Sequence, residues 1–363
     1  MRALKSLERA VRRGFLAATD RPFSGELVTT PRNALGLGET PRLLLLRQDR
    51  IGDVLVSVPV IRALRGRFPR ATIHLLLSRA NDGARPAVEH YLDRAWRYDK
   101  TPASMMRLIR GFRREGYDAV VDLMDNPSTG TQLVARWSGA RARVGIRHER
   151  SGHYTHVVPL LNRQRTHIVE RIAQLLLAFD IDPTRVPLDL EYRLSEADRA
   201  GVRARLGPRT RPLRLGVNIS GSSKARYWGR DNFSTCIRWL QEADPRFAVW
   251  VGGAPAYEAD VTAIARETGA GIIPPLPTFH DFAAVFSEMD LLLTPDTSVL
   301  HLGAAWKIPT VGLFHQPLGA PLPWYPYGTP YRALLHADGV EHIALADVQE
   351  AIRSLVAERL SGA

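Results

Sequence analysis

The feature that most constrains the fold is a short apolar run, a polar loop and a helix-like segment that follow one another between Arg42 and Leu64. Leu43 to Leu46 are four consecutive leucines, which is typical of a strand buried on both faces of a parallel sheet. Residues 54–64 then have the composition of a helix, with Pro59 in its early part. The same order of strand and helix continues along the chain, so the sequence predicts an α/β fold.

This alternation occurs in two series, and the chain of 363 residues is long enough for two domains. The first series has expected strands at 43–46, 71–77, 95–98, 117–124 and 142–146, and expected helices at 54–64, 105–114, 130–138 and 167–179. The second has expected strands at 213–218, 248–252, 271–273, 291–293 and 310–314, and expected helices at 231–242, 257–267, 280–287 and 345–360. We expect two Rossmann-like, doubly wound domains that face each other across a cleft. The expected boundaries are an extension and linker at 1–40, a first domain at 41–185, a second at 186–340 and a C-terminal helix at 341–363.

Charge and composition indicate the kind of partner and the compartment. The net charge of +12 favours anionic partners, namely nucleic acid, acidic lipid or phosphorylated glycans. We expect no spanning helix and no signal peptide, and the single Cys236 is expected to be a small core residue, so a cytoplasmic protein fits. Residues 1–20 carry leucines and arginines at helical spacing, which fits either an interfacial helix on anionic lipid or an ordinary surface helix.

The loop at 47–53 is the first candidate site. In open α/β sheets ligands bind beyond the carboxyl ends of the strands, and this loop follows such a strand. Gly52 lets a substrate approach the backbone, and Asp53 offers a carboxylate, although an aspartate at a helix start is also an ordinary cap. Asn126 leaves another expected strand at the same edge, toward the same crevice as Arg50 and Gly52.

The turn Asp296-Thr297-Ser298 is the second candidate site, between an expected strand and an expected helix. Free amides and the helix dipole at such a start bind phosphate, while the alternative is a simple capped helix. His301 lies one turn further along and could reach a phosphate or a sugar.

The third candidate site is a loop of small residues after the first strand of the second series, Ser220, Gly221 and Ser222. Lys224 and Arg226 follow it and could stabilise the charge of a leaving diphosphate, although a solvated basic loop has the same composition. Glu258 follows a glycine turn and would suit ribose hydroxyls. Four histidines, at positions 148, 153, 156 and 167, lack the spacing of metal ligands, so we expect them at the surface or facing the acceptor, with no metal site.

Three stretches together, RQDRIGDVLVSVPVIRAL, SGSSKARYW and PDTSVLHLGAAWKIPTVGLF, resemble glycosyltransferase family 9, the heptosyltransferases that build the inner core of bacterial lipopolysaccharide. The resemblance extends over residues 42–315. It implies a GT-B fold, with a nucleotide-sugar donor in the C-terminal half and an acceptor in the N-terminal half. It further implies a reaction that inverts the anomeric centre without metal or other cofactor.

The resemblance also implies roles for single residues. Asp53 matches the general base, and Arg226 matches a lysine that contacts the donor phosphates. The remaining donor residues match as a group: the small-residue loop at Ser220, Gly221 and Ser222, the ribose carboxylate Glu258, the diphosphate turn at Asp296, Thr297 and Ser298, and the family histidine His301. The sequence departs from the family pattern in three places: the family has glycine at Ser298, lysine at Arg226 and a small pair at Asp49-Arg50.

We therefore expect a heptosyltransferase that uses ADP-L-glycero-D-manno-heptose and a phosphorylated, lipid-linked core glycan at the cytoplasmic face of the inner membrane. Arg50 and Arg62, with the N-terminal segment, are expected to attract that acceptor and to give peripheral contact with anionic lipid. The alternatives are transfer of another nucleotide-sugar to a different surface glycan, or a catalytically decayed binding protein of envelope assembly. Nucleic-acid binding lacks a supporting motif.

Overall fold

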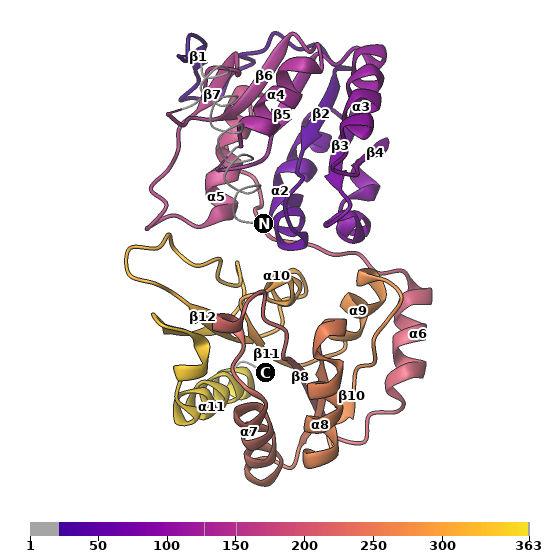
Figure 1. Ribbon diagram of the computed structural model, residues 1–363, viewed down its shortest axis with the longest axis vertical. Helices are drawn as coiled ribbons and strands as arrows, with labels where there is room; N and C mark the ends of the chain where they lie inside the picture. The colour runs from indigo at the N-terminus through magenta and orange to yellow at the C-terminus, as the bar shows by residue number, and fades with distance from the viewer. Residues whose placement is uncertain (1–21, 127, 150, 362–363) are drawn as a thin grey trace, which may run out of the picture.

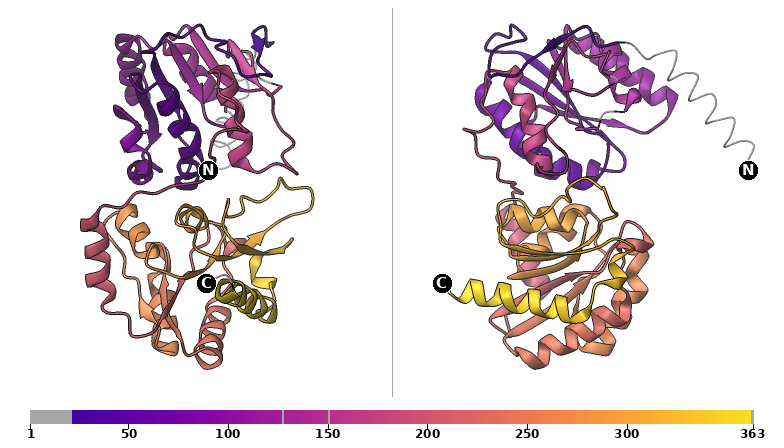
Figure 2. Two further views of the ribbon diagram at one scale, coloured as in Figure 1. Left: turned by 180° about the vertical axis from the view of Figure 1, so that it is seen from behind. Right: turned by 90° about the vertical axis from the view of Figure 1, so that its left-hand side faces the viewer.

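The computed structural model describes residues 22–126, 128–149 and 151–361. The helix expected at 1–20 therefore lies outside the described residues. Two α/β domains lie end to end, each with a parallel sheet flanked by helices (Figures 1 and 2). None of the helices in the described part of the chain combines the length and apolar character needed to cross a lipid bilayer.

The N-terminal domain contains a seven-stranded parallel sheet in the order β1-β7-β6-β5-β2-β3-β4. Its strands are β1 (Glu26–Leu27), β2 (Arg42–Leu46), β3 (Thr72–Ser78), β4 (Arg94–Tyr98), β5 (Ala119–Asp122), β6 (Ala142–Ile146) and β7 (His156–Val158). Leu43 and Leu45 enter one hydrophobic core while Leu44 and Leu46 enter another, so β2 is buried on both faces as its sequence predicts.

The helices of this domain begin with the one that carries the first candidate site. They are α2 (Ile51–Arg67), α3 (Pro102–Glu115), α4 (Thr129–Trp137) and α5 (Ile168–Ala173), and a 3-10 helix continues α5 to Ala178. Helix α2 starts three residues before the expected boundary, so Gly52 lies inside its first turn. Pro59 is accommodated within the same helix.

The C-terminal domain contains a six-stranded parallel sheet in the order β10-β9-β8-β11-β12-β13, the strand order of a dinucleotide-binding Rossmann fold. Its strands are β8 (Leu213–Asn218), β9 (Phe247–Gly252), β10 (Gly271–Ile272), β11 (Leu291–Pro295), β12 (Thr310–His315) and β13 (Tyr331–His336). Its helices are α6 (Glu196–Leu206), α7 (Arg230–Ala243), α8 (Glu258–Thr268), α9 (Phe279–Phe286), α10 (Ser298–Ala305) and α11 (Leu345–Ser361). We did not expect β7 or β13, which are an interior strand of only three residues and an edge strand.

The segment at 22–40 is part of the first domain, which corrects its interpretation as a linker. β1 pairs with β7, and Leu35 and Leu37 enter the N-terminal core. Similarly, α11 is not a separate unit, because its buried residues Val348 and Ile352 belong to the core of the second domain. Both segments pack against parts of the chain that are distant in sequence, and local composition does not reveal such contacts.

Other expectations about single residues have mixed outcomes. Cys236 is buried in the C-terminal core as expected. His153 and His167 are buried, which corrects the surface interpretation, and His167 caps α5 by accepting a hydrogen bond from Val169 N. Among the described residues, no group of histidine, cysteine, aspartate and glutamate could hold a metal ion.

Candidate functional site

The switch point of the C-terminal sheet lies between β8 and β11, where the strand order reverses, and Rossmann-like domains bind ligands at such a point. Asn218 ends β8, and its Nδ2 donates to Thr294 Oγ1 at 2.8 Å and to Thr297 Oγ1 at 3.0 Å. Thr297 is also the N-cap of α10, where its hydroxyl accepts from Val299 N at 3.4 Å. The expected phosphate turn is therefore held by side chains from two strands, and the first amides of α10 have no partner within the helix.

Arg226 is the cation nearest this turn. Its Nη1 lies 3.0 Å from Asp296 Oδ2 and 3.3 Å from Ser222 Oγ, and about a third of its side chain is exposed. Burial raises the pKa of Asp296, while Arg226 and Arg50 act to lower it. Arg50 belongs to the other domain, so its charge acts across the cleft on the turn.

The small-residue loop is folded tightly beside Arg226. A Cβ on Gly221 would lie 2.4 Å from Arg226 O, so only glycine fits there. Ser220 Oγ accepts from Ala254 N at 2.6 Å, which joins this loop to the glycine turn after β9. Lys224 and Ser222 are exposed, and Glu258 is exposed at the start of α8. Trp228, which follows this loop, is a packing residue whose indole donates to Ile343 O.

Asp53 is buried in the first turn of α2, at the corresponding edge of the N-terminal sheet. Its Oδ2 accepts from Arg50 N at 2.9 Å, so it does cap the helix. Its Oδ1 lies 3.3 Å from Nη2 of Arg47, without hydrogen-bond geometry. One carboxylate oxygen is therefore held by the backbone, and the other has only an electrostatic partner.

Arg47 is a residue that the sequence analysis did not single out. Only 2% of it is exposed. Its Nε donates to Asp53 O at 2.8 Å and its Nη1 donates to Leu123 O at 2.8 Å, while Asn81 Nδ2 donates to its carbonyl at 2.9 Å. Arg47 thus joins the ends of β2 and β5 to the start of α2. The available signal in the sequence was a basic residue placed directly after an apolar strand.

Asp49 is a second carboxylate in the same loop. Burial raises its pKa, and the negative charge of Asp53 acts in the same direction, against Arg47 and Arg50. The first loop therefore holds two acidic and two basic side chains in seven residues.

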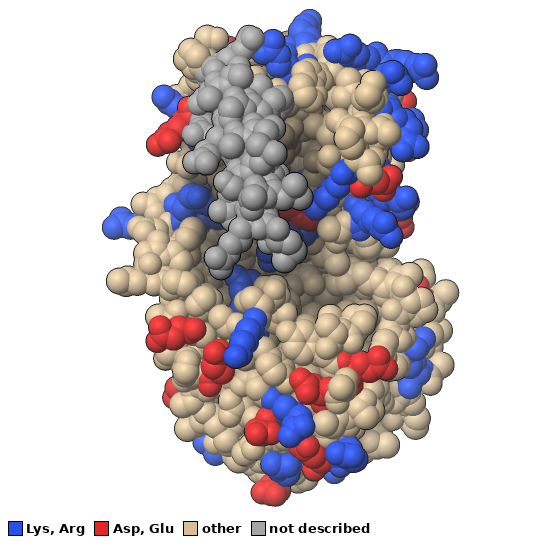
Figure 3. Space-filling view, in the orientation of Figure 1, with Lys and Arg blue, Asp and Glu red and all other residues tan. Residues whose placement is uncertain are grey.

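The two candidate sites meet where α2 approaches α10. A Cβ on Gly52 would lie 3.0 Å from His301 Cδ2, 3.3 Å from His301 Nε2 and 4.0 Å from Ser298 Cα. A side chain at position 52 would thus be tight against His301, and this close approach brings the first turn of α2, which includes Asp53, to the start of α10. Figure 3 shows the surface hollowed at the same junction between the domains.

His301 is buried, and its Nδ1 has no hydrogen-bond partner within the described ranges. Burial lowers its pKa to about 3, with a further contribution from His167. The imidazole is therefore neutral at physiological pH and can accept or donate one hydrogen bond, but it supplies no positive charge for a phosphate.

Asn126 is exposed beyond the end of β5. Its neighbour Asp125 is buried, and Asp125 Oδ2 lies 3.0 Å from Arg171 Nε and 3.5 Å from Arg163 Nε. Leu322 N donates to Arg163 O at 2.8 Å, so the loop after β12 in the second domain contacts this cluster. The sequence analysis did not identify the two arginines.

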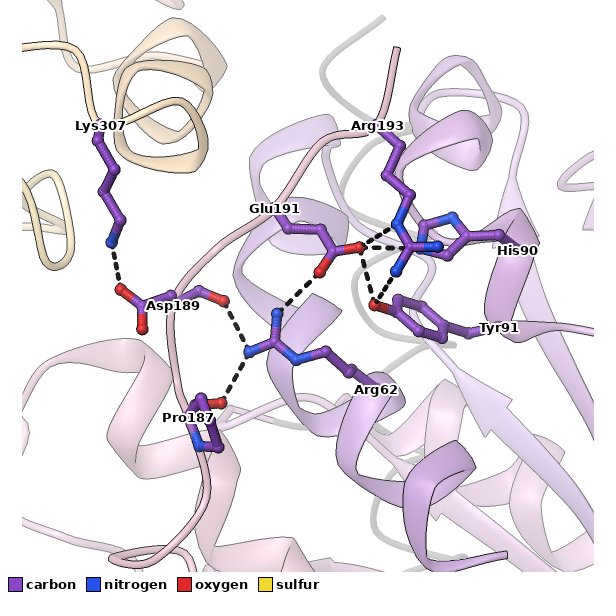
Figure 4. A network of polar contacts seen from close by, with 8 residues as sticks. All are labelled: Arg62, His90, Tyr91, Pro187, Asp189, Glu191, Arg193 and Lys307. Carbon is purple, nitrogen blue, oxygen red and sulfur yellow. Dashed lines mark hydrogen bonds and ion pairs between the residues drawn. The ribbon is translucent and has the colours of Figure 1, made fainter. Parts of the chain in front are cut away.

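Arg62 is used within the protein, which corrects its expected role in attracting an acceptor. Its Nη1 lies 3.0 Å from Glu191 Oε2, and its Nη2 donates to the carbonyls of Pro187 and Asp189 (Figure 4). These partners lie on the segment that connects the domains. Arg50, by contrast, is exposed at the cleft.

Comparison with known proteins identifies the family of this chain. The family described as glycosyltransferase family 9 (heptosyltransferase) matches residues 105–339, which is more than half of the chain. The chain is 25% identical to lipopolysaccharide heptosyltransferase 3 of Escherichia coli (strain K12) over 286 residues, 72% of this chain and 79% of the relative.

Solved structures show the same fold. A glycosyl transferase of family 9 from Veillonella parvula gives a TM-score of 0.76 at 19% identity, covering 89% of this chain and 98% of that chain. The ADP-heptose lps heptosyltransferase II of E. coli gives a TM-score of 0.70 at 18% identity, covering 88% of this chain and 99% of that chain. The two facing Rossmann-like domains are therefore a GT-B architecture.

Proposed function

The chain belongs to glycosyltransferase family 9, the heptosyltransferase family, and on this premise we propose that it transfers a heptose from ADP-L-glycero-D-manno-heptose to a lipopolysaccharide inner-core acceptor. The reaction inverts the anomeric centre and needs no metal. The main support is the approach of α2 to α10 at Gly52 and His301, because it brings a carboxylate and a phosphate-binding helix start to one cleft. The named ligand of the E. coli enzyme of similar fold, ADP-heptose, supports the donor.

In this proposal the donor diphosphate lies at the start of α10, where the free amides of the helix and the guanidinium of Arg226 meet its negative charge. Thr297 and Ser298 line the turn. The segments beside the turn supply Ser220, Gly221, Ser222, Lys224 and Glu258. Of these, Glu258 accepts hydrogen bonds from the ribose hydroxyls. The charge on the leaving diphosphate grows as its bond to the anomeric carbon breaks, so Arg226 stabilises the transition state more than the ground state.

Asp53 is the proposed general base. The acceptor hydroxyl oxygen attacks the anomeric carbon from the face opposite the diphosphate, and its proton passes to the carboxylate. Oδ1 is the oxygen suited to receive it, since Oδ2 is held by Arg50 N. His301, which is neutral, acts as a hydrogen-bonding group toward the sugar.

The proposed acceptor is a phosphorylated, lipid-linked glycan that contacts Arg50, Gly52 and Asn126. The exposure of Arg50 and Asn126 at the N-terminal side of the cleft supports this assignment. The protein would act at the cytoplasmic face of the inner membrane, in peripheral contact with anionic lipid. The strongly basic net charge of +12 supports such contact.

The experiment that tests the proposal is a donor screen followed by turnover. ADP-heptose should raise the melting temperature more than other nucleotide-sugars, because a ligand that binds only the folded state stabilises it by mass action. Turnover with a heptose-deficient lipopolysaccharide core should give a product of inverted anomeric configuration by NMR and should persist in EDTA. Stabilisation by a different nucleotide-sugar alone would replace the donor, and donor binding without any turnover would favour a decayed binding protein.

A further inference from the structure

The segment that connects the domains, residues 186–194, has a strictly alternating pattern. Its even positions are apolar, and its odd positions are Pro187, Asp189, Glu191 and Arg193. Leu190 and Tyr192 are buried in the N-terminal core, and the remaining apolar members pack against it. We call residues 186–194 the strap. It runs along one side of the domain junction (Figures 1 and 2), and its polar residues face the network in Figure 4.

The strap is fastened to the C-terminal part of α2. Arg62 donates to Pro187 O at 2.7 Å and to Asp189 O at 3.0 Å, and it pairs with Glu191 at 3.0 Å. Glu191 also accepts from Tyr91, and Arg193 and His90 lie within hydrogen-bond distance. Burial acts to raise the pKa of Glu191, but these hydrogen bonds outweigh it and lower the pKa to about 2.

The strap is also fastened to the end of α10. Lys307, two residues beyond this helix, forms an ion pair with Asp189 and donates to Gly328 O at 2.9 Å. Trp306 Nε1 donates to Tyr192 O at 2.9 Å. Asp189 is therefore shared: its carbonyl accepts from Arg62 of the first domain, and its carboxylate pairs with Lys307 of the second.

Helices α2 and α10 are the two that carry the site. Their first turns meet at Gly52 and His301, and Leu302 and Ala304 of α10 belong to the same hydrophobic core as α2. Arg62 lies roughly 13 Å along α2 from Asp53, and the end of α10 lies a similar distance from Thr297, at about 1.5 Å per residue. Helices α2 and α10 therefore contact each other at the candidate site, and at their other ends both contact the strap through Asp189. The three segments form a triangle.

From this triangle we infer that Arg62, Asp189 and Lys307 are positioning residues for the transfer reaction, because they hold α2 and α10 in the relative placement that presents Asp53 to the donor. The inference rests on the proposed function for its reaction. None of the three residues touches the site, so their loss should leave donor binding intact and affect the step that needs both domains. A small misplacement of a catalytic group is costly in rate even when its cause is remote.

The test compares Arg62→Met with Arg65→Met. Arg65 lies on the same helix with a similarly exposed side chain, 21% against 24%, and it also binds one carboxylate and several carbonyls. All of its partners belong to the N-terminal domain, so it controls for the loss of a buried cation in α2. Arg62→Met and Lys307→Met should each lower kcat by about tenfold or more with the Kd for ADP within about twofold, and Arg65→Met should retain kcat.

A second measurement does not depend on activity. Spin labels on Met106→Cys in α3 and Glu242→Cys in α7 report the distance between the domains, and the native Cys236 is buried and does not compete. The distance distribution should broaden in Arg62→Met and Lys307→Met and stay narrow in Arg65→Met. The double variant Arg62→Met/Lys307→Met should broaden it little further, since both side chains act through Asp189.

Unchanged distances in Arg62→Met and Lys307→Met would overturn the inference, and so would an equal loss of kcat in Arg62→Met and Arg65→Met. If the wild-type protein did not turn over ADP-heptose, the donor assignment would fall, and the distance measurement alone would decide whether the strap holds the two helices.

Discussion

The two domains have the same kind of switch point but use their charged side chains in opposite ways. In the N-terminal domain, Arg47 between β2 and β5 is 2% exposed and its donors are directed at protein groups. In the C-terminal domain, Arg226 beside β8 and β11 is about a third exposed and has one carboxylate partner, Asp296. The first cation is part of the architecture, while the second is open to solvent and, in the proposed function, exchanges its partner for a ligand phosphate.

This difference shows how one fold serves two purposes in one molecule. In the proposed reaction the proton acceptor must remain in place through the whole cycle, and the groups around Asp53 are held by hydrogen bonds within the protein. The proposed diphosphate site must release its product, and Arg226 lies near the surface, where an ion pair is weak and exchanges readily.

The strongest test of this difference between the domains is a substitution that affects the chemical step. Asp53→Asn keeps the shape and the cap but removes the proton acceptor, so kcat should fall by about 10²–10⁴-fold. The Kd for ADP, measured by calorimetry, should not change, because the diphosphate site lies in the other domain. If the activity of Asp53→Asn stayed within a few-fold of wild type, Asp53 would not be the general base.

Arg47→Met should affect stability first. It leaves the buried Asp53 carboxylate without its cation, and breaking a buried pair costs about 3–5 kcal/mol of unfolding free energy. Denaturant unfolding at pH 7 measures this loss, and Arg47→Lys should recover part of it. A stability equal to wild type would show that Arg47 is not part of the architecture.

Arg226→Met should instead affect ligand affinity. A hydrogen bond to a charged group contributes about 1.5–3 kcal/mol, so the Kd for ADP should rise by about 10–100-fold. The unfolding free energy without ligand should change little, since about a third of the side chain is exposed and its ion pair with Asp296 is open to solvent. Lost stability with unchanged ADP affinity would place Arg226 in the same class as Arg47.

The smallest effect is the pH dependence that comes from His301. Its pKa falls from 6.5 to about 3 on folding, so the unfolded chain binds more protons and the stability is present above pH 6.5 and is lost as the pH falls. Through this residue the free energy of unfolding should fall by about 2 kcal/mol as the pH is lowered from 7 to 5. His301→Gln should flatten this part of the stability curve, measured by denaturant unfolding at pH 5 and pH 7, relative to wild type.

Much of the fold could be predicted from the sequence because the buried strands are short, apolar and separated by helices. Leu43–Leu46 and Leu291–Leu293 are examples in which local pattern and final burial agree. The pattern failed at β1 and β13, which are edge strands with one neighbour each, and at β7, an interior strand of only three residues. Their formation depends on a partner far away in the sequence, and local composition does not encode that partner.

The site could be predicted only as separate pieces. Asp53, Thr297 and His301 each lie next to a recognisable turn, and the structure brings the turns together at Gly52. The contacts of Arg47 and Arg62 depend on tertiary geometry. From sequence alone, an arginine that binds a carboxylate of the protein cannot be distinguished from one that binds a ligand. The strap illustrates this most clearly, because its alternating sequence does not show which partners its polar residues bind.

The pairing of β1 with β7 has a practical consequence for shortening this chain. A protein that began at residue 41 would retain all the strands that carry the site but would lose the two residues that cover the outer edge of β7. It would also lose Leu35 and Leu37 from the interior. Such a truncated protein would present an open strand edge beside a gap in its core, and self-association through that edge is the outcome to guard against.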